Sequence, residues 1–333
     1  MRAVLTAAAA VIMAAVLTVP SAGAAANGEN VWPVELSEEN FPDRVFRQYI
    51  ERQFDYDKDG KLTESEAASV KEIRLNNNKN VTSLKGIEYF PELRELYCSD
   101  DSIESLDVSS NQKLTILNCS SNQIKTLNLS QNSLLEDLEC FDNPLNSLDL
   151  SANTSLKALI CGGNQLEEVD LSHNPELTSF AYLAGSLEEI DFSANPKLQQ
   201  IWISGTPLKE LDVSANPELI SLLVYITNIE TIDLTNNPLL TGSAVNLHSN
   251  RLVSVHMNMV DEDQINLADQ RAVTVRIPRN ETTYDLRNLD PEIDVSAVQG
   301  LDGAVIENGI IKEVKPGMEI AYRYTGDGVD FQA

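Results

Sequence analysis

A repeating pattern of apolar and polar positions dominates the middle of this chain. Its first leucine recurs every 21 residues, at Leu93, Leu114, Leu135, Leu156, Leu177, Leu198 and Leu219. Each copy reads L-x-x-L-x-C/Φ-x-x-x-x-L-x-x-L-D-L-S-x-N-x-x, where Φ is an apolar residue. A period this strict predicts a stack of similar turns with one continuous core and one broad ordered face. Such a face is typical of binding proteins rather than of enzymes with deep pockets.

Two short alternating runs are visible in each copy. In the first, as in Leu96-Tyr97-Cys98, positions four and six are expected to face the core, because alternate side chains of an extended chain point to opposite sides. In the second, as in Leu106-Asp107-Val108, the aspartate is expected to face outward. The pattern therefore predicts a parallel β-solenoid. After Leu239 the register slips by two residues, and a degenerate last turn follows to about Val255.

Segments with other patterns flank the repeat. Phe41 to Phe54 has apolar residues close to i, i+4 spacing and predicts an amphipathic helix, followed by a loop at Asp55 to Glu66 and a second helix from about Ser65 to Glu72. This unit is expected to cap the open end of the stack. Beyond Val260, alternating runs separated by Gly, Asn and Asp predict a small all-β domain, Ig-like or a β cap. The expected strands lie at 272–277, 293–298, 304–306, 310–314 and 319–324.

Residues 1–26 have the composition of an export signal. Arg2 supplies the positive start, an apolar core ends at Pro20, and small residues up to Ala26 fit an A-x-A cleavage site. The alternative is an uncleaved anchor, for which the core is slightly short. We expect a secreted or extracellular chain without a membrane span, and association with the cell surface stays open. The expected domains are the signal peptide 1–26, a helical N-cap 27–72, the solenoid 73–258 and a β domain 259–333.

The charge of the chain narrows the choice of partners. It carries 51 Asp and Glu against 24 Lys and Arg, a formal net charge of -27. Such a surface repels nucleic-acid phosphates and anionic lipid, whereas cations and basic protein patches are attracted to it. No nucleophile motif, phosphate loop or metal-ligand pair accompanies the three histidines, so we expect no enzymatic activity.

The four cysteines occupy position six in consecutive copies, at Cys98, Cys119, Cys140 and Cys161. Two disulfides between neighbours would be the ordinary expectation for an exported protein. The same position carries apolar residues in the later copies, namely Tyr182, Ile203 and Val224. The position therefore demands bulk and apolarity, which favours free, buried thiols.

A complete calcium-loop pattern lies between the two expected helices. Residues 55–66 place carboxylates at positions 1, 3, 5 and 12 and glycine at position 6, which resembles an EF-hand loop. The alternative is an acidic turn with a Thr63–Glu66 capping box. We expect a weak, structural Ca²⁺ site. Its ligands would come from Asp55, Asp57, Asp59, Lys61 (through its carbonyl), Thr63 (through water) and Glu66.

Two polar files run along the repeat. Position nineteen is asparagine in every copy, and we expect its amide to bond backbone groups of its own and neighbouring turns. Position fifteen is aspartate in all copies but one, where Asn128 replaces it. Stacked like charges are unfavourable, so each carboxylate is expected to accept a hydrogen bond from the adjacent turn's backbone or from the serine hydroxyl two residues on.

The outward positions of the first run are mostly small or polar, with six exceptions. These are Phe141, Ile160, Leu183, Trp202, Leu223 and Tyr225. Because they lie on neighbouring turns, they are expected to merge into one apolar patch across five strands. Clustered exposed aromatic residues usually mark a protein or ligand contact. The alternatives are that the C-terminal domain or a loop covers the patch, or that it pairs in a dimer.

The chain resembles the secreted and surface leucine-rich-repeat proteins of Gram-positive bacteria related to the internalins. The likeness is strong over residues 38–258 and is carried by Asn40-Phe41-Pro42-Asp43, Asp57-Lys58-Asp59-Gly60, the phrase SLKGIEYF at 83–90 and the Leu148-Asp149-Leu150-Ser151 type. It implies a right-handed leucine-rich-repeat β-solenoid whose concave face holds a host or microbial protein. We therefore expect a monomeric binding module for a protein partner, with a glycan as the alternative ligand. The alternative function is a structural or spacer module of the cell envelope that self-associates through the same patch.

Overall fold

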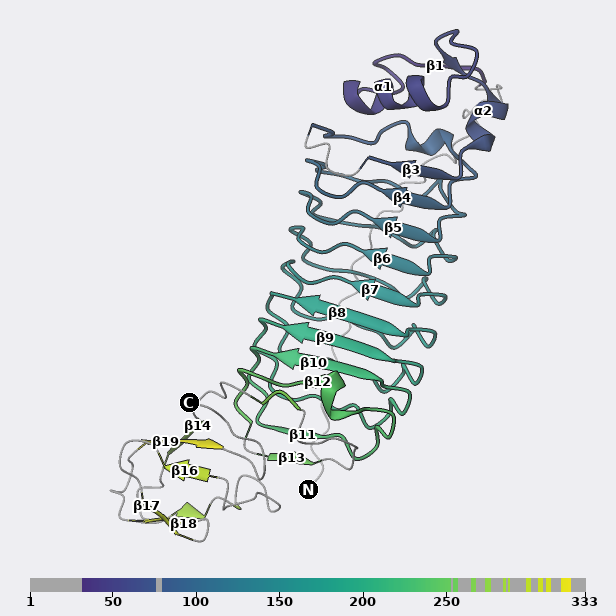
Figure 1. The fold of residues 1–333 in the computed structure, drawn as a ribbon. Coiled ribbons are helices and arrows are strands. Elements are labelled where there is room, and N and C mark those ends of the chain that lie inside the picture. Colours follow the sequence, from purple (N-terminus) through teal and green to yellow (C-terminus); the bar gives the residue numbers. More distant parts are fainter. Residues whose placement is uncertain are drawn as a thin grey trace, which may run out of the picture.

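The computed structural model describes residues 32–75 and 80–252 and short segments beyond them. These segments are 254–256, 265–267, 273–276, 284–285, 287, 298–300, 305–307, 310–312 and 319–324. The expected signal peptide lies outside the described residues. Figure 1 shows a stack of turns with two helices at one end. Within the described residues, no helix has both the length and the apolar character needed to cross a membrane.

The turns contribute their first runs to a single parallel sheet. Among the described residues it has nine strands in the order β12-β10-β9-β8-β7-β6-β5-β4-β3. The register places equivalent repeat positions side by side, as for Leu96, Leu117 and Leu138. This confirms the parallel β-solenoid with its 21-residue spacing. The strands are β3 (Glu72–Arg74), β4 (Glu95–Tyr97), β5 (Ile116–Asn118), β6 (Asp137–Glu139), β7 (Ala158–Ile160), β8 (Ser179–Leu183), β9 (Gln200–Ser204), β10 (Ser221–Tyr225) and β12 (Val245–Asn246).

The leucines that set the period form one interior column. All seven, from Leu93 to Leu219, are 0% exposed and belong to one continuous hydrophobic cluster. The four cysteines lie in the same cluster as free thiols, each 0% exposed. Their desolvation raises the pKa of Cys119 and Cys161 to about 12, and raises those of Cys98 and Cys140 well above the ordinary 9.0.

The second run of each turn is extended but mostly outside any sheet. Its apolar residues are buried and its aspartate is exposed, as in Leu106, Val108 and Asp107. Each aspartate Oδ1 accepts a hydrogen bond from the backbone amide two residues later, as Asp149 does from Ser151 at 2.9 Å. This amide therefore does not pair with a neighbouring strand. Serine hydrogen bonds lower the pKa of Asp149 and Asp170. In the part of the chain that the structure describes, only β11 (Thr231–Asp233) pairs here, with β13 (Ser254–His256).

Two files of buried asparagines join the turns. In the first file each Nδ2 donates to carbonyls 24 and 21 residues earlier, as Asn153 does to Leu129 (3.2 Å) and Asn132 (2.9 Å). The Oδ1 atoms of this file accept no hydrogen bond within the described residues, so the side chain acts only as a donor. The file comprises Asn111, Asn132, Asn153, Asn174, Asn195, Asn216 and Asn237.

The second asparagine file was not predicted. It stands three residues after each of three cysteines, at Asn122, Asn143 and Asn164. Here the oxygen is used as well, because Asn122 Oδ1 accepts the amide of Ile103 (3.0 Å). Its Nδ2 donates to the carbonyls of Cys98 and Cys119. This file therefore ties the end of each strand to the adjacent turns.

The N-terminal elements differ in their ends from the prediction. Helix α1 is Arg44–Gln53 and does not begin at Phe41, because the Asp43 side chain caps it by accepting the amides of Val45 and Phe46. Helix α2 is Glu64–Ser69, and Glu72, expected in this helix, begins β3 instead. The loop between them contains β2 (Lys61–Leu62), which pairs antiparallel with β1 (Val34–Glu35). Neither short strand was predicted.

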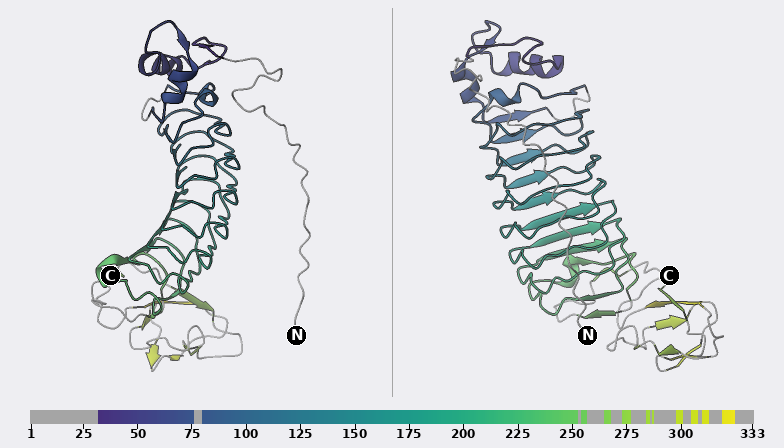
Figure 2. Two further views of the ribbon diagram at one scale, coloured as in Figure 1. Left: turned by 90° about the vertical axis from the view of Figure 1, so that its right-hand side faces the viewer. Right: turned by 180° about the vertical axis from the view of Figure 1, so that it is seen from behind.

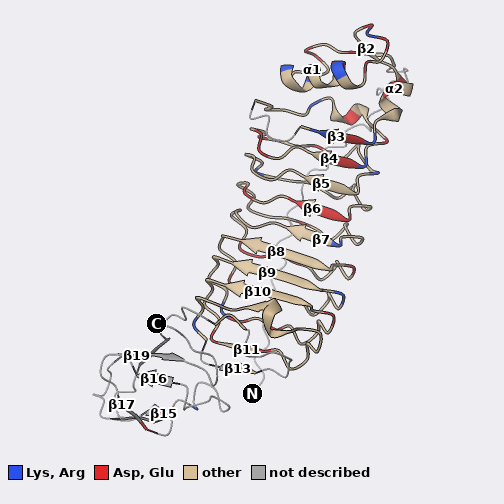
Figure 3. Cartoon of the chain, in the orientation of Figure 1, with Lys and Arg blue, Asp and Glu red and all other residues tan. Residues whose placement is uncertain are grey.

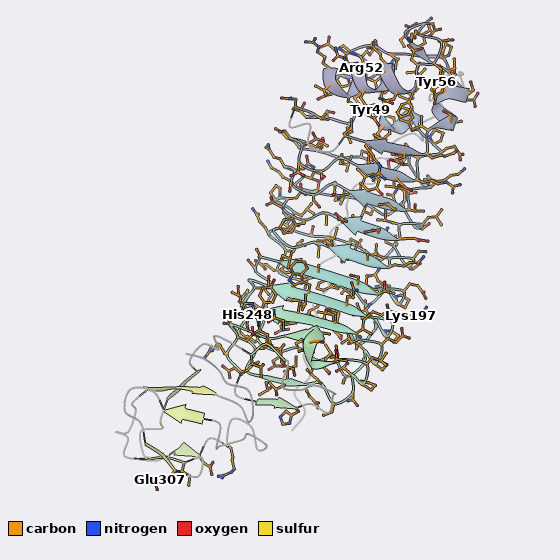
Figure 4. The ribbon with its side chains drawn as sticks, viewed as in Figure 1. Tyr49, Arg52, Tyr56, Lys197, His248 and Glu307 are labelled. Atoms are coloured by element: carbon orange, nitrogen blue, oxygen red, sulfur yellow. The ribbon has the colours of Figure 1, made fainter. Side chains whose placement is uncertain are left out.

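Helix α1 packs against the first turn of the stack. Its buried residues Phe46 and Ile50 share the hydrophobic cluster of the repeats. Asp43 Oδ2 accepts the amide and the hydroxyl of Thr82, and Tyr49 Oη accepts the amide of Arg74 in the end strand β3 (3.1 Å). Figure 4 labels Tyr49 beside this end of the sheet. An otherwise unpaired strand amide is thus satisfied by the helical segment.

Beyond the repeat, the described segments form two antiparallel sheets. One has the order β14-β19-β16, with β14 at Val273–Arg276, β19 at Glu319–Tyr324 and β16 at Val298–Gly300. The other has the order β15-β18-β17, with β15 at Tyr284–Asp285, β18 at Ile310–Lys312 and β17 at Val305–Glu307. Four predicted strands overlap observed ones. The run at 293–298 meets β16 only at Val298, since 293–297 lie outside the described residues, and β15 was not predicted.

The burial of the thiols predicts their reactivity and a dependence of stability on alkaline pH. The native protein should leave all four unlabelled by a thiol reagent that labels them fully after unfolding. A raised native pKa stabilises the fold fully below pH 9.0, and this stabilisation is lost as the pH rises towards about 12. The loss is about 1.4 kcal/mol per pH unit and thiol.

Cys119→Val, which installs the residue found at the equivalent position 224, is the control. Between pH 9 and 11, the free energy of unfolding of this variant, measured by urea unfolding, should fall less steeply with pH than that of the wild type. The difference between the two slopes is the contribution of one thiol. A native protein that is lighter by two hydrogen atoms for each pair of cysteines would contain disulfides and would contradict the prediction. Rapid labelling of the native thiols would contradict it as well.

Candidate functional site

The outer face of the nine-stranded sheet is a regular surface, because equivalent repeat positions lie side by side on it. In the side view of Figure 2 the stack bends, and the sheet lies on the inner, concave side of the bend. Side chains at repeat positions three, five and seven face away from the core here, since positions four and six are buried. The six apolar residues predicted to form a patch all occupy such positions. They are called the Trp202 patch below.

Strand register defines how the Trp202 patch is arranged. One row runs through Ile160, Ala181, Trp202 and Leu223, on β7 to β10. A parallel row holds Leu183, Ser204 and Tyr225 on β8 to β10. In each row one small residue, Ala181 or Ser204, therefore lies between large side chains on the adjacent strands. Trp202 is 41% exposed, and the other patch residues are partly buried.

An aromatic cluster lies at the β10 end of the patch. Trp202 Nε1 donates to Tyr225 Oη at 2.9 Å. The Tyr225 ring stacks on His248, with centroids 4.5 Å apart and planes 18° apart. Figure 4 places His248 at the arrowhead ends of β8 to β10. His248 lies in the degenerate last turn, after the register has slipped by two residues. Its stacking on Tyr225 has no counterpart in the other copies, so the repeat pattern did not predict it.

Two glycines allow Phe141 to join the patch. A side-chain carbon added at Gly162 would lie 2.1 Å from the backbone nitrogen of Leu183, and one at Gly163 would lie 3.2 Å from a ring carbon of Phe141. Phe141 follows strand β6, and its ring lies against Gly163, which follows β7 in the next turn. Gly163 thus leaves room for the Phe141 ring, and Gly162 leaves room for the backbone of Leu183.

The residue at position eight of each turn adopts a left-handed backbone. Its φ lies between 53° and 67° in eight turns, at Asp100, Ser121, Asp142, Gly163, Ala184, Gly205, Ile226 and Ser249. Most of these residues are small or polar and tolerate this conformation. Ile226 does not, because a β-branched side chain is strained there. Ile226 is 49% exposed and directly follows Tyr225, so the strained residue lies at the edge of the Trp202 patch.

The next strands of the same face are acidic. Figure 3 shows β7 to β10 without charged residues, and acidic residues on β6, β4 and β3. Asp137 and Glu139 on β6 are both partly buried, and desolvation raises the pKa of each. Glu139 accepts a hydrogen bond from Asn118 Nδ2 at 2.6 Å. Within the described part of the chain, no ion pair joins either carboxylate to Lys or Arg.

The predicted calcium ligands lie in the loop between α1 and α2, except Glu66, which lies in the first turn of α2. Carboxylate oxygens of Asp55, Asp57 and Asp59 lie within 4.8 Å of one another. The hydrogen bond from the Asp59 amide lowers the pKa of Asp57, but desolvation and the charges of Asp59 and Glu66 together outweigh it, so the pKa is raised. A cation between these carboxylates would relieve this repulsion. The donor set consists of oxygen atoms, as Ca²⁺ requires.

Glu66 takes part in the capping box that the sequence left as the alternative. Its Oε2 accepts the amide (2.8 Å) and hydroxyl (2.7 Å) of Thr63, and its Oε1 accepts the amide of Tyr56 (2.8 Å). Burial would raise the pKa of Glu66, but these donors together lower it. Glu66 would therefore bind a cation only in exchange for part of this network. Asp55 similarly accepts the amides of Asp59 and Gly60.

Comparison with known proteins supports the fold. A scan against protein-family models finds no match, and a search of curated proteins finds none. Among solved structures, the functional domain of InlJ from Listeria monocytogenes, which includes a cysteine ladder, is 22% identical with a TM-score of 0.55. That match covers 80% of this chain and 66% of the InlJ chain.

Two further structures have a similar likeness. Internalin InlF from L. monocytogenes is 18% identical with a TM-score of 0.55, over 72% of this chain and 79% of its own. A leucine-rich-repeat protein from Leptospira interrogans is 18% identical with a TM-score of 0.54, over 62% of this chain and 55% of its own. The leucine-rich-repeat solenoid of the internalin type is therefore the fold of this chain.

The strain at Ile226 predicts that stability can be gained at the patch. Ile226→Asn should raise the free energy of unfolding by about 1 kcal/mol, because asparagine tolerates the left-handed conformation. Ile220→Asn is the matched control: Ile220 is 44% exposed, and its φ is not positive. The control should be neutral or destabilising in urea unfolding. Equal effects of the two substitutions would show that φ at residue 226 stores no strain.

Proposed function

We propose that this chain is a secreted, non-enzymatic binding protein that holds a partner protein on the concave face of its solenoid. The observation that carries the proposal is the Trp202 patch: an exposed indole, hydrogen-bonded to Tyr225, among the large apolar side chains of four neighbouring turns. Trp and Tyr that are fixed in place supply most of the binding energy at protein interfaces. A solenoid presents such residues on a surface that a globular partner can cover.

The remaining features are consistent with export. Residues 1–26 would be the signal peptide, 27–72 the helical cap, 73–258 the solenoid and 259–333 a β domain. The file of four buried cysteines, Cys98, Cys119, Cys140 and Cys161, would correspond to the cysteine ladder described for InlJ. In the exported protein these thiols would stay reduced because reagents cannot reach them, as their complete burial supports.

The proposal is tested by comparing capture on three immobilised proteins. The wild type should retain at least one protein from host or microbial extracts that Trp202→Ala/Leu183→Ala fails to retain, because the variant removes two patch residues. Leu134→Ala/Ile220→Ala is the control, since it removes exposed apolar residues outside the patch and should capture as the wild type does.

The melting temperatures of all three proteins should be similar, because the substituted side chains are at least partly exposed. Identical sets of captured proteins on the three surfaces would contradict a binding role for the patch. Sedimentation at low micromolar concentration addresses the alternative function. A stable dimer that Trp202→Ala/Leu183→Ala dissociates would indicate self-association as a structural module.

We also propose a structural Ca²⁺ ion in the loop at residues 55–66. Asp55, Asp57, Asp59 and Glu66 would hold it with the Lys61 carbonyl, and Thr63 through water. The mutual repulsion of the carboxylates supports this assignment. The ion would neutralise the loop and stiffen the connection between α1 and α2. It would thereby stabilise the cap rather than act on a partner.

Calcium titration tests this site. At ten times the dissociation constant, Ca²⁺ should stabilise the protein by about 1.4 kcal/mol, and the expected constant is on the order of 10⁻⁴ to 10⁻³ M. Asp57→Asn/Asp59→Asn should abolish the rise in melting temperature. Glu38→Gln/Glu39→Gln, which removes two exposed charges nearby, should retain it. No rise in the wild type beyond that in sodium chloride of equal ionic strength would refute the site.

A further inference from the structure

We propose that the partner presents a cationic side chain, Lys or Arg, beside an apolar anchor, and that the cation docks on Asp137 and Glu139 while the anchor docks on the Trp202 patch. This inference rests on the proposed function, since it specifies the chemistry of the protein that the concave face would hold. It requires that the acidic pair and the patch form one continuous surface.

Strand register shows that they do. Glu139 lies directly beside Ile160 of the Trp202 patch in the ladder between β6 and β7. Phe141 extends the patch on the chain that continues from β6, two residues after Glu139. A partner large enough to cover the patch therefore covers these carboxylates as well.

Among the residues that the structure describes, no Lys or Arg forms an ion pair with Asp137 or Glu139. In the ladder Asp137 has Ile116 on one side and Ala158 on the other. Glu139 lies between Asn118 and Ile160. By contrast, the acidic residues of the first strands have a local cation, because Arg74 pairs with Glu72 and Glu95 and stacks on the Tyr97 ring. The negative charge on β6 is thus the part of the face available to a cation from outside.

The free-energy cost of covering Asp137 and Glu139 depends on the charge of the partner. The carboxylates are already partly desolvated, and a partner that buries them without an opposite charge leaves two unpaired charges in a low-dielectric interface. A neutral or acidic partner is therefore disfavoured, whereas Lys or Arg gains a charge-assisted hydrogen bond. The net charge of -27 also steers a basic partner towards the protein from a distance.

The sheet sets the spacing that the partner must match. From β6 to β9, which carries Trp202, there are three steps in the sheet, or roughly 14 Å at about 4.8 Å per step. An extended segment spans this distance in about four residues, at roughly 3.3 Å each. The recognised feature is therefore a basic residue about four positions from an aromatic or large aliphatic residue, when the segment is extended.

Selection from random twelve-residue peptides displayed on phage tests this chemistry. The wild type should enrich peptides of net positive charge with Lys or Arg about four residues from an apolar residue. Asp137→Asn/Glu139→Gln keeps the shape of both side chains and removes the charges. It should lose the preference for positive charge and bind the wild-type peptides roughly tenfold more weakly. Its melting temperature should not fall, since both carboxylates have raised pKa values in the native state.

Glu167→Gln/Glu168→Gln is the matched control, because it removes two exposed charges outside the sheet. It should select the same peptides as the wild type. If the enriched peptides are neutral or acidic yet are lost by Trp202→Ala/Leu183→Ala, the cationic inference is wrong and the binding role of the patch stands. If no enriched peptide depends on Trp202 and Leu183, the proposed function itself fails, and this inference fails with it.

Discussion

The donation of each buried asparagine amide to two carbonyls of preceding turns is the interaction on which this structure depends. A turn of 21 residues must leave strand geometry several times, and each departure places backbone carbonyls inside without a ladder partner. Asn153 Nδ2 donates to two of them, at Leu129 and Asn132, which also accept the turn amides of Asn132 and Leu135, and the other members of the file repeat the arrangement. Because these donors join turns at a fixed offset, they hold the register. Register in turn decides which side chains face outward, and so it positions the Trp202 patch.

The repeat changes its internal bonding within the patch, in the turn that contains β8. The asparagine three residues after the cysteine is replaced by Gly185, and the cysteine by Tyr182. A side-chain carbon at Gly185 would lie 2.5 Å from Tyr182 Oη, so the ring occupies the vacated space. Its hydroxyl donates to the Leu166 carbonyl at 3.0 Å, and in the next turn the Thr206 hydroxyl donates to the equivalent carbonyl of Leu187. From this turn on, β8, β9 and β10 have five residues instead of three.

Much of the architecture could be predicted from the sequence because it depends on period alone. The Leu93 column, the buried cysteines, the exposed Asp107 file and the adjacency of the patch strands all follow from a constant 21-residue spacing. The remaining features depend on single contacts that have no period. The start of α1 is set by the cap at Asp43, and β1 is recognised only through its pairing with β2.

The same limit applies to the candidate site. The outward direction of Trp202 follows from alternation, but its bond to Tyr225 and the stacking of His248 require the folded register. The left-handed backbone at Ile226 was hidden because Asp, Ser, Ala and Gly at the equivalent positions have no common apolar or polar character. The calcium loop and the capping box could not be separated by sequence, and the structure shows why. Glu66 belongs to both, since its donors lie within the loop.

Three locally unfavourable features coincide on the concave face, and their distribution is informative. Trp202 is exposed, Ile226 is held in a strained backbone, and Asp137 and Glu139 have raised pKa values without a cation. On the opposite side of the turns, aspartates of the same charge have lowered pKa values, because serine donors satisfy them. The repeat therefore contains a means of stabilising an outward carboxylate, yet β6 does not use it. A surface shaped only for the stability of the isolated chain would avoid all three features, whereas a partner that buries the indole and neutralises the carboxylates removes two of them on binding.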